Sequence, residues 1–81
     1  GNQFAATLRV VGQDDIGIVS NITSLINKEG DATLRNISIN SNGELFEGIL
    51  VIGINSSGQL TVLMDKIKKL KGVKDVMRTN N

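Results

Sequence analysis

Hydrophobic residues follow two spacings that alternate along the chain and predict six elements. From Phe4 to Gln13 apolar residues occupy every second position, the pattern of a strand with one buried face. Helical spacing follows from Ile18 to about Glu29, and a second helical pattern runs from Leu60 to Lys71. Strand-like patterns return over residues 32–40, 45–54 and 73–77. The predicted order is therefore β-α-β-β-α-β.

Polar residues and glycines mark where the two helices begin and end. Asp14 or Asp15 can accept hydrogen bonds from the free amides of the first helical turn, and Gly30 can close that helix in the left-handed conformation. Ser56 and Gln59 have the spacing of a capping box, in which each side chain accepts a backbone hydrogen bond from the other end of the turn. Both helices are thus delimited by local chemistry.

The middle of the chain predicts a hairpin. A change of hydrophobic parity near Arg35 and Asn36 indicates a β-bulge in the second strand. Asn42-Gly43 then supplies a pair that tolerates positive φ, as a tight turn requires. Over 45–54 both parities are apolar, so we expect both faces of this strand to be covered, as in a central strand.

Two β-α-β halves with right-handed crossovers predict an α+β, ferredoxin-like fold: a four-stranded antiparallel sheet with both helices on one face. One domain is expected over residues 4–79, preceded by an added or disordered start at 1–3 and followed by a tail at 80–81. The strand over 32–40 contains neither Pro nor Lys. Such an unprotected edge invites pairing with a second copy, so a homodimer is expected.

The amino-acid composition excludes several classes of catalytic and binding site. Of 81 residues, 40% are hydrophobic, and Val and Ile supply 17 of them, which favours a sheet-containing core. The chain contains no His, Cys, Trp or Tyr. Ser-His and Cys-His nucleophiles, imidazole or thiolate metal sites and most base-stacking surfaces are therefore excluded. We expect no catalysis, no metal and no cofactor in this chain.

Charge is distributed unevenly. Residues 1–61 carry three basic and six acidic groups, whereas 62–81 carry six basic and two acidic groups. The lysines between 66 and 74 could bind RNA phosphates, but with only two Phe in the chain a solvated helix face is the better interpretation. No run is long enough to span a bilayer and no signal peptide opens the sequence, so we expect a cytoplasmic location and no membrane partner.

Two motifs carry a resemblance to a known family. Asp14-x-x-Gly17-Ile18-Val19, between the first strand and first helix, resembles the ACT domain family, regulatory modules that commonly bind amino acids at a dimer interface. The ending Gly72-Val73-x-x-Val76-x-Arg78 is similar to the C-terminal ACT domain of Rel/SpoT-type enzymes, which make or hydrolyse guanosine tetra- and pentaphosphate. The similarity covers residues 6–79. It departs from the family at Asp15, where Arg or another residue often follows the loop aspartate.

The residues and the resemblance together suggest a ligand site. Gly17 allows close approach to the backbone, the open amides of the first helix suit a carboxylate, and Asp14 or Asp15 could meet an ammonium group. The resemblance implies a second wall from a partner copy, near the start of the second strand. Candidate ligand-binding residues are Asp14, Asp15, Ile16, Gly17, Ile18, Arg35, Asn36 and Ile37.

Other interpretations of these residues stay open. Asp14 and Asp15 fit a helix cap equally well, with Gly17 only a packing residue, and the Arg35–Ile37 segment needs no function beyond an edge strand. If a ligand binds, Ile16 and Ile18 and the resemblance point to Val or Ile as that amino acid.

The resemblance implies a noncatalytic regulatory domain at the C-terminus of a GTP pyrophosphokinase, or (p)ppGpp synthetase-hydrolase, that senses an amino acid or the state of the ribosome. Its implied partners are the parent's catalytic domains and, through the parent, the ribosome or tRNA. The alternative is the amino-acid-binding ACT domain of a biosynthetic enzyme. The parent's identity follows from the resemblance alone.

Two enzymatic interpretations of the first loop are disfavoured. Gly12-x-x-x-x-Gly17 has P-loop glycine spacing, but Ile18 and Val19 stand where a Lys and a hydroxyl would hold phosphates and magnesium. An acylphosphatase would need a basic, phosphate-cradling loop, and the carboxylates of this loop would repel an acyl phosphate.

Overall fold

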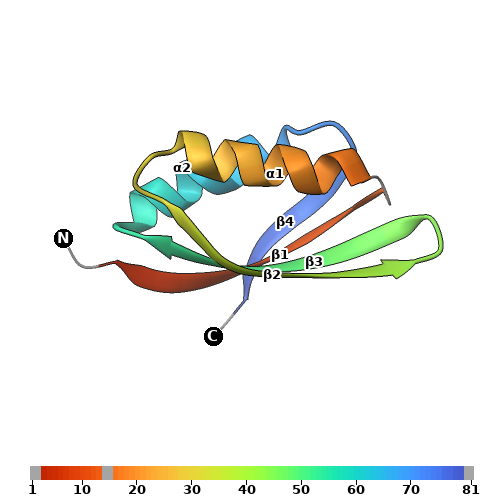
Figure 1. The fold of residues 1–81 in the computed structure, drawn as a ribbon, viewed down its shortest axis with the longest axis horizontal. Coiled ribbons are helices and arrows are strands. Elements are labelled where there is room, and N and C mark those ends of the chain that lie inside the picture. Colours follow the sequence, from red (N-terminus) through yellow and green to blue (C-terminus); the bar gives the residue numbers. More distant parts are fainter. Residues whose placement is uncertain (1–2, 14–15, 80–81) are drawn as a thin grey trace.

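The computed structural model describes residues 3–13 and 16–79 of the chain. The elements follow in the order predicted from the hydrophobic pattern, β-α-β-β-α-β (Figure 1). They are β1 (Phe4–Gln13), α1 (Ile16–Lys28), β2 (Thr33–Asn42), β3 (Leu45–Ile54), α2 (Ser57–Lys68) and β4 (Val73–Thr79).

The four strands form one antiparallel sheet in the order β2-β3-β1-β4. Both helices cover the same face of this sheet, as Figure 1 shows. The arrangement is the ferredoxin-like fold that the element order predicts. β3 and β1 lie in the centre, and β2 and β4 form the two edges.

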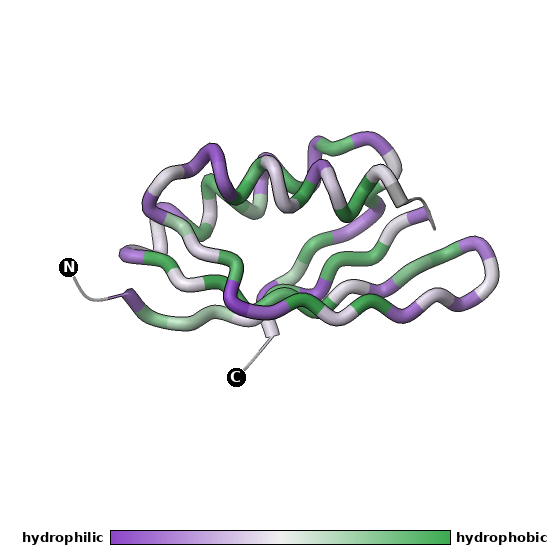
Figure 2. Tube along the Cα trace, viewed as in Figure 1, coloured by the Kyte–Doolittle hydropathy of each residue, from purple (hydrophilic) through white to green (hydrophobic). Residues whose placement is uncertain are grey.

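The hydrophobic core fills the layer between the helices and the sheet. In β1, Ala6, Leu8 and Val10 are completely buried, whereas the intervening Arg9 is only half-buried, which is the expected alternation of a strand. Figure 2 shows how hydrophobic and polar positions alternate along the strands and helices. The helices contribute Ile18, Ile22, Ile26, Leu60, Leu63 and Ile67.

β3 is a central strand, but only one of its faces is covered. Ile49 and Val51 alternate with the buried residues and lie half-buried on the sheet face opposite the helices. On that face Arg9 forms an ion pair with Glu47 of the neighbouring strand. The prediction that both faces of this strand are covered was wrong, because the single chain has two layers and leaves one sheet face open.

Local chemistry sets the start of α2 and the end of α1 as predicted. The backbone N–H of Gln59 donates to Ser56 Oγ over 3.1 Å, and Gln59 Oε1 accepts from the N–H of Asn55 over 2.7 Å. The reciprocal bond thus reaches one residue beyond the N-cap. Gly30 adopts a φ of 71° directly after α1, which confirms its predicted left-handed conformation.

α2 ends earlier than its hydrophobic spacing predicts, at Lys68 rather than Lys71. Leu70 keeps the helical spacing and remains half-buried, but it belongs to a tight turn. In that turn the N–H of Leu70 donates to the carbonyl of Ile67, and the N–H of Val73 donates to the carbonyl of Leu70. Burial of Leu70 explains why the pattern extended beyond the helix.

The β2–β3 hairpin turns one residue later than predicted, and its first strand is two residues longer at that end. A register shift between Leu34 and Asn36 confirms the bulge. β2 continues to Asn42, and of the predicted Asn-Gly pair only Gly43 has positive φ, at 67°. The loop is therefore Gly43-Glu44, with glycine at its first position, where such two-residue turns require it.

Candidate functional site

The junction between β1 and α1 carries five of the predicted ligand-binding residues. Asp14 and Asp15 lie outside the described residues, so neither their capping nor their binding role is tested. Ile16 begins α1, and Gly17 follows as an exposed second residue of that helix. Ile18 is 2% exposed and belongs to the core. A ligand at the surface of the single chain would therefore meet Gly17 and not the side chain of Ile18.

The junction is fixed to the turn before β4. The N–H of Gln13 donates to the carbonyl of Gly72 over 2.9 Å. A Cβ on Gly12 would lie 2.5 Å from the same carbonyl oxygen, and a Cβ on Gly72 would lie 2.7 Å from Ile18 Cδ1. Gly12 is thus required by the close approach of two backbone segments, and Gly72 is favoured by its φ of 92°, which L side chains rarely adopt. This close approach at Gly12 was not predicted from the sequence, where the available signal was a glycine inside a strand pattern.

The three remaining candidates lie on β2. Arg35 and Asn36 are exposed at the bulge, and Ile37 is half-buried beside them. This bulge pairs with the end of β3, whereas the β1–α1 junction lies at the hairpin end of the sheet. α1 runs between these two ends (Figure 1), and its length from Gly17 to Lys28 is about 16 Å. One chain therefore does not bring the two groups of candidates together.

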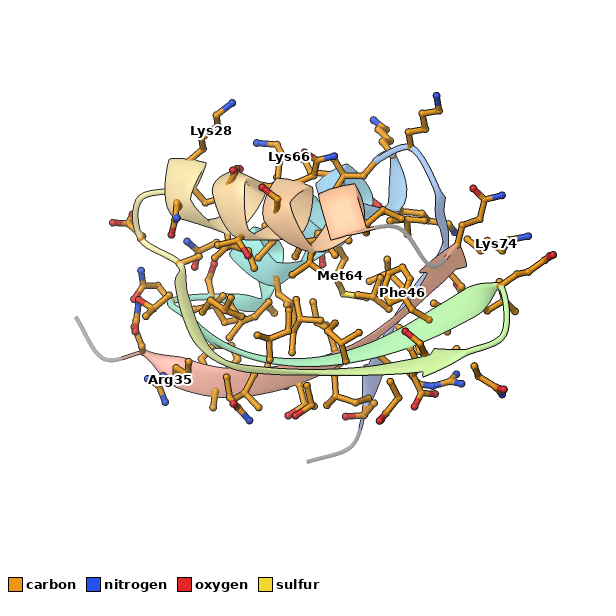
Figure 3. The ribbon with its side chains drawn as sticks, turned by 45° about the vertical axis from the view of Figure 1, so that its right-hand side comes forward. Lys28, Arg35, Phe46, Met64, Lys66 and Lys74 are labelled. Atoms are coloured by element: carbon orange, nitrogen blue, oxygen red, sulfur yellow. The ribbon has the colours of Figure 1, made fainter. Side chains whose placement is uncertain are left out.

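Most of the lysines belong to the two helices and to the turn that follows α2. Lys66 Nζ forms an ion pair with Glu29 Oε1 over 2.6 Å, which links α2 to the end of α1. In Figure 3 Lys28 and Lys66 point away from the sheet. Phe46 is buried, at 3% exposure, so it is unavailable for base stacking. The absence of a stacking aromatic beside the lysines agrees with their interpretation as a solvated face.

Two kinds of feature are absent from the described part of the chain, residues 3–13 and 16–79. Its acidic residues form no group of three that could hold a metal ion. None of its helices is both long enough and apolar enough to cross a membrane.

Comparison with known proteins identifies the family. The family model of the ACT domain matches residues 1–78. The chain belongs to the ACT domain family. ACT domains are regulatory modules, and the ferredoxin-like fold of this chain is that of the family. Comparison with the curated proteins finds no match.

Solved structures show that this ACT domain is similar to the ACT domain of one GTP pyrophosphokinase. A crystal structure of the ACT domain from GTP pyrophosphokinase of Chlorobium tepidum is 38% identical, with a TM-score of 0.81, covering 95% of this chain and 99% of that one. Its solution NMR structure is also 38% identical, with a TM-score of 0.80, covering 98% and 89%. A homoserine dehydrogenase from Thiobacillus denitrificans shares only the fold, at 21% identity and a TM-score of 0.77, covering 94% of this chain and 17% of that one.

Proposed function

We propose that this ACT domain is the C-terminal regulatory module of a GTP pyrophosphokinase, that it senses an amino acid or the state of the ribosome, and that it passes this signal to catalytic domains in the same protein. The identity of 38% over nearly the whole chain to the Chlorobium tepidum domain is the observation that supports this parent. The domain itself acts by binding and docking in the cytoplasm, not by turnover.

The sensing unit of this proposal is a homodimer formed through the β2 edge. β2 is ten residues long, carries one charged residue, Arg35, and leaves Ile39 38% exposed on the helix side of the sheet. Ile37 lies on the same side and is half-buried. A second β2 strand would satisfy the free backbone groups of this edge and cover both isoleucines.

Pairing of two copies through β2 would also bring together the two groups of candidate ligand-binding residues, which are far apart in one chain. In an antiparallel pairing about a two-fold axis, each copy's β2 runs towards the start of the other. The bulge of one copy, with Arg35 and Asn36, therefore moves towards the hairpin end of its partner, where Gly17 lies. The ligand, proposed to be Val or Ile, is then enclosed between the β1–α1 junction of one copy and β2 of the other.

A substitution at Gly17 tests this site. Gly17→Val places a branched side chain where the ligand approaches the backbone, so we expect the affinity for valine and isoleucine to fall by tenfold or more in calorimetry. Gly58→Val is the matched control, because Gly58 is also the second residue of its helix and a Cβ there meets nothing closer than 3.9 Å. Absence of heat with any common amino acid at millimolar concentration would refute amino acid sensing by this domain.

The coding sequence upstream of residue 1 tests the proposed parent. Hydrolase and synthetase domains for guanosine polyphosphates are expected there. Catalytic domains of amino acid biosynthesis would instead support the alternative parent.

A further inference from the structure

Asn42 is the only asparagine of the chain that is followed by a glycine. It is the last residue of β2, and its pair with Leu45 is the last pair before the β2–β3 hairpin turns. The hairpin extends beyond the helices at this end of the molecule (Figure 1). Asn42, Gly43 and Glu44 are all exposed to water. The Asn42–Gly43 peptide therefore lies open to solvent on a projecting segment.

The side-chain amide of Asn42 and the backbone N–H of Gly43 are not held by hydrogen bonds. Within residues 3–13 and 16–79, neither group has a hydrogen-bond partner, because the ladder of β2 and β3 ends at the Asn42–Leu45 pair. Gly43 also has no Cβ that could hinder a reaction at its nitrogen. Every other described asparagine is followed by a residue with a side chain, as Asn40 is by a serine.

We propose that Asn42 is a site of spontaneous covalent modification, in which its side-chain amide is lost through a succinimide. The nitrogen of Gly43 attacks Cγ of Asn42 and forms a bond with it. The bond between Cγ and Nδ2 breaks, and the amide nitrogen leaves as ammonia with the proton of the Gly43 N–H. Water then opens the succinimide ring. Opening at the side-chain carbonyl gives aspartate, whereas opening at the main-chain carbonyl gives isoaspartate.

The folded hairpin controls the rate of this reaction. As a strand residue, Asn42 has an extended backbone, and in that conformation the nitrogen of the next residue is turned away from Cγ. The ring therefore closes only when the last pair of the ladder opens. Pairs at the end of a hairpin open more easily than the core strands do. Conversion is thus expected in the folded chain, but more slowly than in the unfolded chain.

Both products change the tip of the hairpin. Each adds a carboxylate two residues from Glu44 and lowers the net charge of the chain, which is +1, by one unit. Isoaspartate also adds Cβ to the path of the main chain. Residue 42 then no longer keeps its register opposite Leu45, so β2 loses its last pair.

Peptide mapping by mass spectrometry tests the location. The 81-residue chain is incubated at mildly alkaline pH, both folded and unfolded in urea, and the acidic product is separated by ion exchange. We expect residue 42 to convert first in both samples, as aspartate and isoaspartate, and several-fold more slowly in the folded one. Earlier conversion of another asparagine, or conversion in urea with none in the folded chain, would overturn the proposal.

A matched pair of variants tests the reacting amide. Asn42→Ser removes it, so the early acidic product should be lost. Asn40→Ser is the control, because Asn40 lies on the same strand two residues earlier and is also exposed. It should convert at the rate of the unaltered chain. The proposal fails if the acidic product persists in Asn42→Ser or disappears in Asn40→Ser.

A substitution at Gly43 tests the attacking nitrogen. Gly43→Ala adds a Cβ beside this nitrogen, which should slow conversion of Asn42 several-fold. The comparison is made in urea, because the positive φ of Gly43 would strain the folded hairpin of the variant. Gly48→Ala, also in urea, is the control and should leave the rate unchanged. Equal rates in the two variants would show that the amide is lost by direct hydrolysis and not through a succinimide.

Discussion

The two edges of the sheet differ in length and in charge. β2 is ten residues long with Arg35 as its one charged residue, whereas β4 is seven residues long and carries Lys74, Asp75 and Arg78. Each edge leaves one large apolar side chain exposed to a similar degree, Ile39 at 38% and Met77 at 43%. Exposed hydrophobicity therefore does not distinguish the edges, but charge does.

The difference in charge between β2 and β4 indicates which edge of the sheet can pair with a second copy of the chain. Charged side chains on an edge strand disfavour pairing with another chain because they would have to be desolvated. β4 is protected in this way, and the turn that leads into it is also held to β1 by the Gly12–Gly72 approach. β2 has neither feature, which makes it the edge that we expect to pair.

The largest expected effect is on assembly. Ile39→Lys places a charge in the proposed interface, so we expect the dimer dissociation constant to rise by roughly a hundredfold or more. Light scattering at high micromolar concentration should then give a monomeric mass. Met77→Lys, at a residue of similar exposure on β4, is the control and should remain dimeric. A dimer that survives Ile39→Lys, or dissociates with Met77→Lys, would contradict the assignment of β2.

A smaller effect is expected on the free energy of unfolding. It is measured by comparing alanine substitutions at two glycines, one near each edge of the sheet. Gly12→Ala places a methyl group 2.5 Å from the backbone oxygen of Gly72, which cannot rotate away, so we expect unfolding to become about 1–3 kcal/mol easier. At Gly48 the nearest atom is Ile39 Cδ1 at 3.1 Å, the flexible end of an exposed side chain. Gly48→Ala should therefore cost less than about 1 kcal/mol in urea unfolding. Equal costs would show that β4 is not more tightly held than β2.

The smallest effect is expected from removing the protection of β4. Lys74→Thr combined with Arg78→Thr leaves a β-branched edge with less charge, and we expect weak association beyond the dimer, because each removed charge contributes less than about 1 kcal/mol. Sedimentation velocity at increasing concentration measures it. Lys69→Thr combined with Lys71→Thr removes the same net charge outside the edge. Equal association of the two double variants would attribute the effect to net charge alone.

Much of the fold follows from local sequence. The spacing of apolar residues predicts all six elements, because a strand or helix buries one face and that face repeats with the element's own period. Ser56 and Gln59 predict the start of α2, and the parity change near Arg35 predicts the bulge, since these features depend on neighbours within a few residues. The family motif around Gly17 is local in the same sense, and it predicts the family that the comparisons confirm.

Only the tertiary structure decided which faces and segments meet. The apolar pattern of β3 does not reveal that Ile49 lies half-buried on the open face of the sheet, because the number of layers is a property of the assembled chain. Gly12 and Gly72 are far apart in sequence, and their contact exists only after β1 and β4 pair. An open cavity lined by Gln13, Leu45 and Lys74 arises in the same way, from three segments that the sheet order places side by side. The local spacing of apolar residues determines which face each element buries. The pairing of distant strands determines which surfaces remain exposed and available for binding.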